Sequence, residues 1–190
     1  MIKIGILGDI GSGKSYVAKH FGCPVFNADI EVGKLYKKDR KVFNKLKKVL
    51  PKYIYSFPIN KNEISNAILA NKINLKKIVK IVHLEIRKKM NIFLKKNRNK
   101  KIIILDIPLL LENKINKKND ILIFVQSKKS EIYKRLQKKK NFNLRLFKRF
   151  KKIQLPLEYK RKKSQFVLNN NFTNNTLKKD IKLILRKILL

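Results

Sequence analysis

The chain of 190 residues contains a single cysteine, no tryptophan, six glycines and only 12 acidic residues. Because Cys23 has no second cysteine to pair with, an intrachain disulfide is excluded and a reducing compartment is favoured, with Cys23 as a buried, inert thiol. No apolar run approaches the ~18 residues that a membrane span requires. The first residues reach Gly8 and Asp9 too soon to form the apolar core of a signal peptide. We therefore expect a cytoplasmic protein with no membrane partner.

The scarcity of acidic residues leaves a formal net charge of +37, which taken alone suggests nucleic acid or an anionic membrane as partner. The charge comes from 41 lysines and only 8 arginines, and lysine, isoleucine and asparagine together occupy 87 positions. All three can be encoded with A and T alone, so an AT-biased genome accounts for the composition. A nucleic-acid reader would favour arginine, whose planar guanidinium suits phosphates and guanine edges. We interpret most of the charge as a solvated lysine surface, which disfavours a nucleic-acid partner.

Apolar residues make up 44% of the chain, enough for a buried core, and the length fits one domain. A short apolar run at 2–7 ends in a glycine-rich turn, and a helical pattern at 14–21 and a second run at 25–27 follow. This order begins a βαβ unit with both strands in one parallel sheet. Two further runs, 102–105 and 121–125, predict central strands of that sheet, covered on both faces.

Most of the remaining chain has helical periodicity or composition. The segments expected to be helical are 31–50, ending near Pro51, a long amphipathic stretch over 75–93, most of 128–163, and 177–188. Residues 166–168 are expected to form a last short strand. The pattern predicts an α/β fold in which helices cover both faces of a parallel sheet, a three-layer α/β/α arrangement.

Residues 8–15 read Gly-Asp-Ile-Gly-Ser-Gly-Lys-Ser and match G-x-x-x-x-G-K-[ST] in full, between a predicted strand and a predicted helix. Such a loop points its N–H groups inward at phosphate oxygens, and the following helix adds its positive N-terminal end. Lys14 can then reach the β- and γ-phosphates, while the Ser15 hydroxyl is placed to ligate Mg²⁺. An ordinary glycine turn is the alternative, which the full match disfavours. The residues expected to contact ATP are Gly8, Gly11, Ser12, Gly13, Lys14, Ser15 and Tyr16.

A phosphate loop needs an acidic partner for the metal at the end of a neighbouring strand, and Asp106 meets that description. The alternative is that Asp106 caps the next segment, which the nearby Pro108 disfavours. A GTPase would carry N-K-x-D, but the nearest string, 116–119, ends in asparagine. The residues therefore favour a small-molecule kinase of the P-loop NTPase type.

The sequence resembles the dephospho-CoA kinase family from about residue 4 to residue 170. Besides the phosphate loop, the motifs that carry the resemblance are Ala28-Asp29, His83, Asp106-Ile107-Pro108-Leu109-Leu110-Leu111-Glu112, Arg135, Gln154 and 166–170. The resemblance implies a single domain over 1–190, with a helical acceptor-binding insertion at about 31–98 and a lid at about 128–163. It also implies that ATP, with Mg²⁺, phosphorylates the ribose 3′-hydroxyl of dephospho-CoA to give CoA and ADP.

The resemblance further implies roles for single residues. Asp29 matches the family's acidic residue near the acceptor hydroxyl, although the residues alone allow it to N-cap a helix starting near Ile30. Arg135 matches a lid arginine that stabilises the transferred group, or else is an exposed helix residue. With Lys14, these two form the expected catalytic set. The residues expected to bind the acceptor are Asp29, His83, Arg87, Asp106 and Pro108; for His83 the alternative is a place at the border of the core.

Several positions depart from the family pattern. Asp9 replaces a glycine in the phosphate loop, and its side chain is expected to face the acceptor or solvent, because an inward carboxylate would repel the triphosphate. Tyr16 replaces a small threonine and Asn27 replaces an aspartate. The lysines at 138–140 stand where a second lid arginine is common.

Two alternatives stay open at this point. The first is another P-loop kinase, acting on a nucleoside monophosphate or a small alcohol. The second is a basic nucleic-acid-binding protein that uses Phe142, Phe147 and Phe150 as stacking platforms. The helical spacing of Leu144, Phe147 and Lys151 instead indicates packing. The sequence leaves the oligomeric state open, with a monomer as one possibility.

Overall fold

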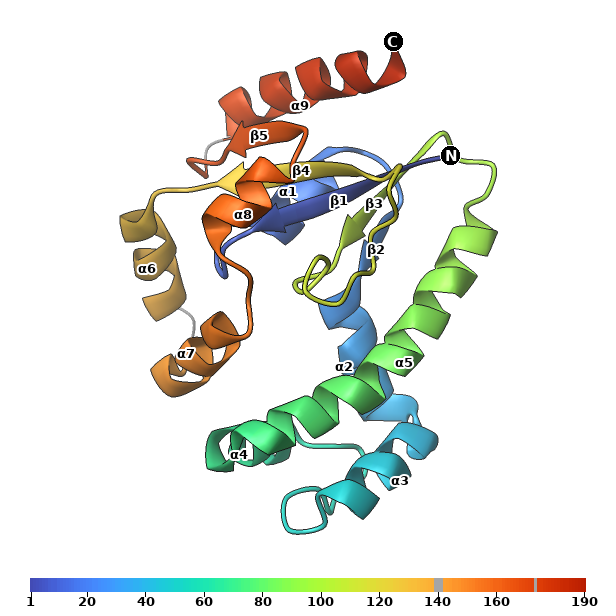
Figure 1. Cartoon of the computed structure of the whole chain (residues 1–190), viewed down its shortest axis with the longest axis vertical. Coiled ribbons are helices and arrows are strands. Elements are labelled where there is room, and N and C mark those ends of the chain that lie inside the picture. Colours follow the sequence, from blue (N-terminus) through green and yellow to red (C-terminus); the bar gives the residue numbers. More distant parts are fainter. Residues whose placement is uncertain (139–141, 173) are drawn as a thin grey trace. The chain divides into compact units, whose positions relative to one another are not determined.

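The computed structural model describes residues 1–138, 142–172 and 174–190 (Figure 1). The chain divides into two compact units. The first unit comprises Met1–Asn27, Asn97–Phe142 and Ile153–Leu190, and the second comprises Ala28–Lys96 and Asn143–Lys152. The second unit thus takes in most of the segment expected as an insertion, together with part of the segment expected as a lid.

The first unit is built on a five-stranded parallel sheet, which confirms the predicted fold class. Its strands are β1 (Ile2–Gly8), β2 (Val25–Asn27), β3 (Ile102–Asp106), β4 (Ile121–Gln126) and β5 (Phe166–Asn169). The order across the sheet is β2-β3-β1-β4-β5. The runs predicted as central strands do lie inside the sheet, since β3 and β4 flank β1 on either side.

Helices cover both faces of this sheet. Helices α1 (Lys14–His20) and α9 (Asn174–Leu189) bury apolar side chains against one face, where Val17, Leu177 and Ile181 join Ile4 and Ile6 of β1 in the core. Helix α8 (Leu157–Lys162) packs against β1 and lies in front of the sheet in Figure 1, with α1 behind it. Helix α6 (Lys129–Gln137) follows β4. The three-layer arrangement is therefore confirmed.

The second unit is helical. It contains α2 (Ala28–Lys38), α3 (Arg40–Val49), α4 (Lys61–Ala70), α5 (Lys72–Lys96) and α7 (Leu144–Lys152). The long helix α5 packs against α2, α3 and α4, and α4 also packs against α7. Leu75, Val82 and Ile86 of the predicted apolar stripe on α5 are buried as expected.

Two predictions for the second unit are wrong. The single helix expected over 31–50 is interrupted at Asp39, whose side chain accepts a hydrogen bond from the N–H of Val42 at 3.0 Å and so begins a new helix. Helix α4 lies between the segments expected to be helical, where no helix was expected, although Asn60 with Glu63 three residues later is a helix-start pattern. Asn60 does cap α4, accepting from the N–H of Asn62 at 2.9 Å.

The packing expected for α7 is found only in part. Leu144, its first residue, is 42% exposed, because the helix turns its other side toward α4. Phe147 is half-buried. Arg149 donates a hydrogen bond to the carbonyl oxygen of Leu69 on α4, at 3.3 Å.

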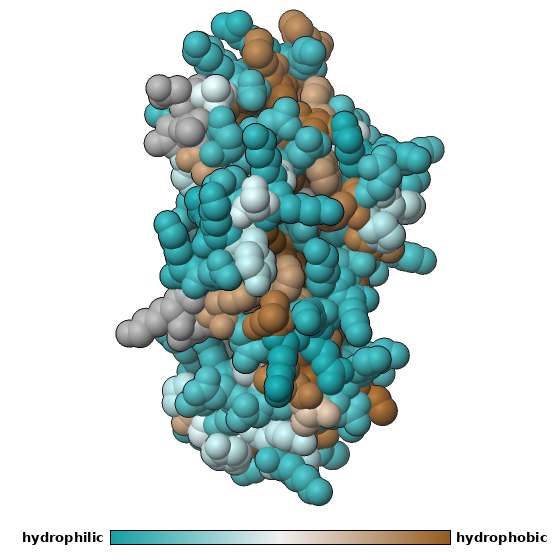
Figure 2. Space-filling view, turned by 90° about the vertical axis from the view of Figure 1, so that its left-hand side faces the viewer, coloured by the Kyte–Doolittle hydropathy of each residue, from teal (hydrophilic) through white to brown (hydrophobic). Residues whose placement is uncertain are grey.

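Lysine side chains dominate the molecular surface, as the composition predicts. The face in Figure 2 is mostly hydrophilic, with smaller hydrophobic areas between the polar side chains. Among the described residues no helix is long and apolar enough to cross a membrane. Cys23 is half-buried instead of fully buried, and burial raises the pKa of its free thiol.

The cap at Asp39 can be tested by Asp39→Ala. Loss of the side-chain acceptor leaves the first N–H groups of α3 unsatisfied, so the free energy of unfolding should fall by about 1 kcal/mol. Urea unfolding followed by circular dichroism measures this. Lys38→Ala, at an exposed neighbouring position, is the control and should change stability little. Equal stability of the two variants would contradict the cap.

Candidate active site

The glycine-rich segment between β1 and α1 forms a tight loop whose backbone only glycine adopts without strain. The φ angles are 145° at Gly8, 86° at Gly11 and 87° at Gly13, all in the region that disfavours side chains. Gly13 is also close to its surroundings, since a Cβ there would overlap the side-chain amide of Asn170. These constraints agree with the predicted phosphate-binding loop.

Lys14 spans this loop. Its Nζ donates hydrogen bonds to the carbonyl oxygens of Asp9, at 2.7 Å, and Gly8, at 3.2 Å. The ammonium is therefore held beside the loop on main-chain oxygens, which are weaker partners for a cation than phosphate oxygens are. This position beside the glycine turn suits Lys14 to the phosphate-binding role expected of it.

Two side chains from distant segments form hydrogen bonds to the main chain of the loop. The carbonyl oxygen of Ser12 accepts hydrogen bonds from Ser127 Oγ and from Asn170 Nδ2, both at 2.9 Å. The Ser12 side chain is fully buried, and its Oγ has no hydrogen-bond partner among the described residues. Ser12 was expected to contact ATP; in this structure its hydroxyl is buried and its N–H donates to the carbonyl oxygen of Asp9 at 3.2 Å.

The two metal ligands expected from the sequence, Ser15 and Asp106, both contact the side-chain amide of Asn27. Asn27 Nδ2 donates to Asp106 Oδ2 at 2.5 Å and to Ser15 Oγ at 3.4 Å. The parallel register pairs Asn27 with Asp106 at the carboxyl ends of β2 and β3. Asp106 is only 3% exposed, so its carboxylate is directed at a few fixed neighbours. Ser15 and Asp106 are thus brought together, as the motif predicted.

Arg135 on α6 is placed near the loop by an aromatic ring. Its guanidinium carbon lies 3.9 Å from the ring centroid of Phe172, a cation–π distance. The N–H of Phe172 donates to Asn170 Oδ1 at 3.0 Å, and Asn170 in turn binds Ser12. Sequence reasoning assigned no role to Asn170 or Phe172. The asparagine-rich stretch after a predicted edge strand was the available signal, but its partner in the loop could not be read from it.

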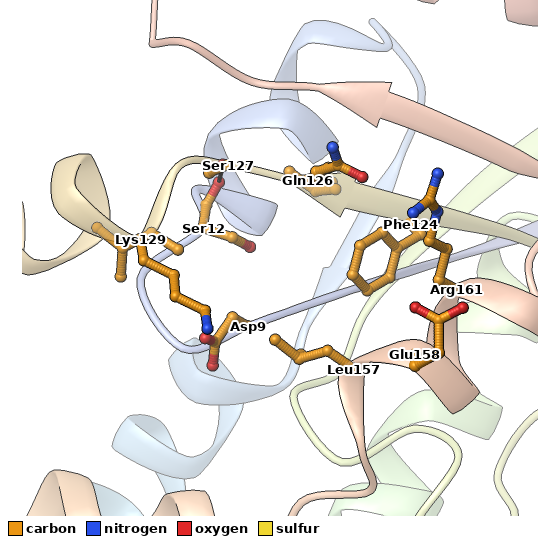
Figure 3. A pocket seen from close by; sticks show the side chains of 11 residues that line it. Asp9, Ser12, Phe124, Gln126, Ser127, Lys129, Leu157, Glu158 and Arg161 are labelled. Atoms are coloured by element: carbon orange, nitrogen blue, oxygen red, sulfur yellow. Dashed lines mark hydrogen bonds between the residues drawn. The ribbon is translucent and has the colours of Figure 1, made fainter.

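Asp9 does not face solvent, which excludes one of the two alternatives expected for it. Its side chain is 7% exposed and accepts the N–H of Ile10 at 2.7 Å. It lines a cavity of about 180 Å³ beside the loop, and Figure 3 shows Lys129 extending toward it. Arg161 of α8 lines the same cavity. Glu158 lines it as well, so two carboxylates and two basic side chains surround the cavity, an arrangement that the loop motif does not predict.

The expected acceptor residues Asp29, His83 and Arg87 belong to the second unit. Asp29 lies in the first turn of α2, which starts at Ala28, so the alternative of a cap for a helix starting near Ile30 is wrong. His83 and Arg87 lie one turn apart on α5. Burial, and then the charge of Arg87, lower the pKa of the half-buried His83, so its imidazole is neutral at pH 7. Arg87 is exposed.

Three further predictions concern residues at the margins of the site. Tyr16 packs its ring against His20, with centroids 4.3 Å apart, and contributes to the core beside α1. Pro108 is half-buried in the turn that follows Asp106. Of the lysines at 138–140, Lys138 is exposed and the other two lie outside the described residues.

The family model and the curated relatives indicate one family. A family model described as dephospho-CoA kinase matches residues 2–176. A dephospho-CoA kinase from Wolbachia sp. subsp. Brugia malayi is 31% identical over 184 residues, which cover 94% of each chain. The solved structure of TT1252 from Thermus thermophilus has a TM-score of 0.77 at 24% identity, covering 98% of this chain and 97% of its own. A dephospho-CoA kinase from Campylobacter jejuni has a TM-score of 0.63 at 19% identity, covering 98% and 96%. The two structures share the fold.

Replacing Lys14 tests the loop. In Lys14→Ala the positive charge beside the glycine turn is lost, so ATP-dependent turnover should fall below detection in an assay of ADP release. Lys19→Ala removes an exposed lysine from the same helix and should keep wild-type turnover. Wild-type turnover in Lys14→Ala would refute the assignment of this loop.

Proposed function

The chain belongs to the dephospho-CoA kinase family, and from that premise we propose how its residues use ATP to phosphorylate dephospho-CoA and form CoA. The observation that carries the proposal is the convergence of Lys14, Ser15 and Asp106 around the glycine loop and Asn27. A lysine, a hydroxyl and a carboxylate are the groups that P-loop kinases use to hold a nucleotide triphosphate and its metal.

In the proposed reaction, the bond between the γ-phosphorus and the β,γ-bridging oxygen breaks as the ribose 3′-oxygen bonds to that phosphorus. The loop N–H groups and Lys14 hold the phosphates of ATP and stabilise the charge that develops on the leaving ADP. Because little covalent chemistry falls to the protein in phosphoryl transfer, its task is positioning and charge stabilisation. The residues of the glycine loop carry the donor side of that task.

Ser15 and Asp106 are the proposed Mg²⁺ ligands. Mg²⁺ prefers oxygen ligands and is usually held by one or two protein groups together with phosphates and water, so a hydroxyl and one buried carboxylate fit it. The two groups share Asn27 as hydrogen-bond partner, which supports their proposed role as ligands of one ion. When bound, the ion would supply positive charge to the β- and γ-phosphates. An aspartate at position 27 would add a carboxylate, so Asn27 leaves this site with one negative charge fewer than the family pattern.

Asp29 is proposed to orient the acceptor hydroxyl and to accept its proton. A carboxylate is suited to this because it accepts a hydrogen bond from the hydroxyl and directs the oxygen lone pair at the γ-phosphorus. His83, Arg87 and Pro108 are proposed to bind dephospho-CoA. A neutral His83 can donate or accept a hydrogen bond, whereas Arg87 offers a planar cation to a phosphate of the acceptor.

Arg135 is proposed to stabilise the phosphoryl group in transfer. Its guanidinium lies over the Phe172 ring and not on a carboxylate, so no ion pair among the described side chains has to be broken before it reaches a phosphate.

The enzyme is proposed to act in the cytoplasm, where ATP is supplied and where a free thiol such as Cys23 stays reduced.

The variant Asp29→Asn tests the acceptor side. An amide keeps the shape but cannot take the proton, so kcat should fall by about 100-fold or more while the dissociation constant of ATP stays within twofold. ADP release with dephospho-CoA and equilibrium binding of ATP are the two measurements.

The matched control is Glu31→Gln, which removes the other carboxylate in the first turn of α2, where it pairs with Lys34 at 2.6 Å. This variant should retain wild-type kcat. If Asp29→Asn turned over as fast as Glu31→Gln, Asp29 would have no part in catalysis.

A further inference from the structure

One lysine of this lysine-rich chain is buried. Lys160 on α8 is 1% exposed, and within the described part of the chain no other lysine is buried. Its Nζ lies 2.7 Å from Glu112 Oε1 and donates to Gln154 Oε1 at 3.2 Å. Burying an ammonium costs free energy unless the group is paired and hydrogen-bonded. Glu112 and Gln154 provide that pairing and hydrogen bonding for Lys160. Neither residue has a part in the reaction proposed above.

The Glu112 carboxylate makes its described contacts at this same buried position. Glu112 Oε1 also accepts the N–H of Leu155 at 3.0 Å, while Oε2 is buried with no hydrogen-bond partner among the described residues. If Lys160 were removed, Glu112 would keep only one neutral donor in a buried place. The two charges therefore depend on each other, and the segments that carry them are held together.

Those segments are the turn after β3 and helix α8. Glu112 lies in the turn over 108–114, which begins at Pro108, a proposed acceptor residue, two positions after Asp106, a proposed metal ligand at the end of β3. Inside that turn Leu110 is fully buried over β1, where a Cβ at Gly5 would lie 2.5 Å from its Cδ2. The turn is thus anchored by the strand end at Asp106, by Leu110 on β1, and by Glu112 on Lys160.

The other end of the pair fixes α8 beside the phosphate loop. Leu157, Glu158 and Arg161 of α8 line the cavity that also contains Asp9 and Ser12 (Figure 3). Lys160, on the same short helix, pairs instead with Glu112. One buried contact thus connects the turn after β3 with the helix that lines this cavity.

We propose that Glu112 and Lys160 are a pair of positioning residues that hold the turn after β3, which carries Pro108 and follows Asp106, in place for phosphoryl transfer. They touch no substrate and act through the main chain of that turn. The inference rests on the roles proposed for Asp106 and Pro108.

Glu112→Gln and Lys160→Met each remove one charge and test the pair. For the folded enzyme we expect kcat to fall about tenfold and KM for dephospho-CoA to rise several-fold, with the dissociation constant of ATP within twofold of wild type. Amide hydrogen exchange of residues 107–113 should become at least tenfold faster, measured without nucleotide. If the charge variants do not fold, Gln154→Ala is used instead, because it removes only the second hydrogen-bond acceptor of Lys160. It should change kcat, KM and the exchange rate in the same direction but by smaller factors.

Lys3→Met is the matched control. It breaks another ion pair of the same unit, Lys3 with Asp120 at 3.2 Å, at the opposite end of β1 from the phosphate loop. It should lower the melting temperature but leave the kinetic constants and the exchange of 107–113 unchanged.

The pair would be only a structural contact, and the inference overturned, if its variants behaved like Lys3→Met, with a lower melting temperature but wild-type kinetics and exchange. A wild-type protein inactive on dephospho-CoA would instead contradict the proposed function. The exchange comparison decides on the pair in either case, because it does not depend on turnover.

Discussion

Parallel pairing of β1 with β3 and β4, and of β3 with β2, is the constraint on which the rest of the site depends. It brings the carboxyl ends of β1, β2 and β3 to one edge, so that Gly8, Asn27 and Asp106 end their strands together. A slip of one residue in β3 would turn the Asp106 side chain to the other face of the sheet. The glycine loop, Lys14 and Ser15 then follow directly from β1 at that edge.

The sequence predicts what is encoded locally. The strands were found because short apolar runs end abruptly at glycine or aspartate, and the phosphate loop because its whole pattern lies within eight residues, 8–15. The break at Asp39 was missed because one capping side chain outweighs a continuous basic helical pattern. Contacts between distant segments, such as Asn170 with Ser12 and Lys160 with Glu112, leave no local signal. The burial of Asp9 likewise depends on α6 and α8, which the loop motif does not contain.

The net charge of +37 contributes little to the identity of the site. The described contacts of the phosphate loop and the proposed metal site use glycine, serine, asparagine and aspartate together with one lysine, Lys14. Lysines elsewhere are mostly exposed, where they raise the local concentration of anionic substrates without selecting among them. Lys160 is the exception, because its charge is buried, paired and directed at one carboxylate.

The most direct test of the account is the choice of acceptor. Purified protein with ATP and Mg²⁺ is offered dephospho-CoA, AMP, CMP, dTMP or shikimate, and ADP release is measured together with the position of the new phosphate. The account predicts ADP release with dephospho-CoA well above the other four, and a product phosphorylated on the ribose 3′-oxygen. Release with one of the nucleotides or with shikimate, and none with dephospho-CoA, would contradict it.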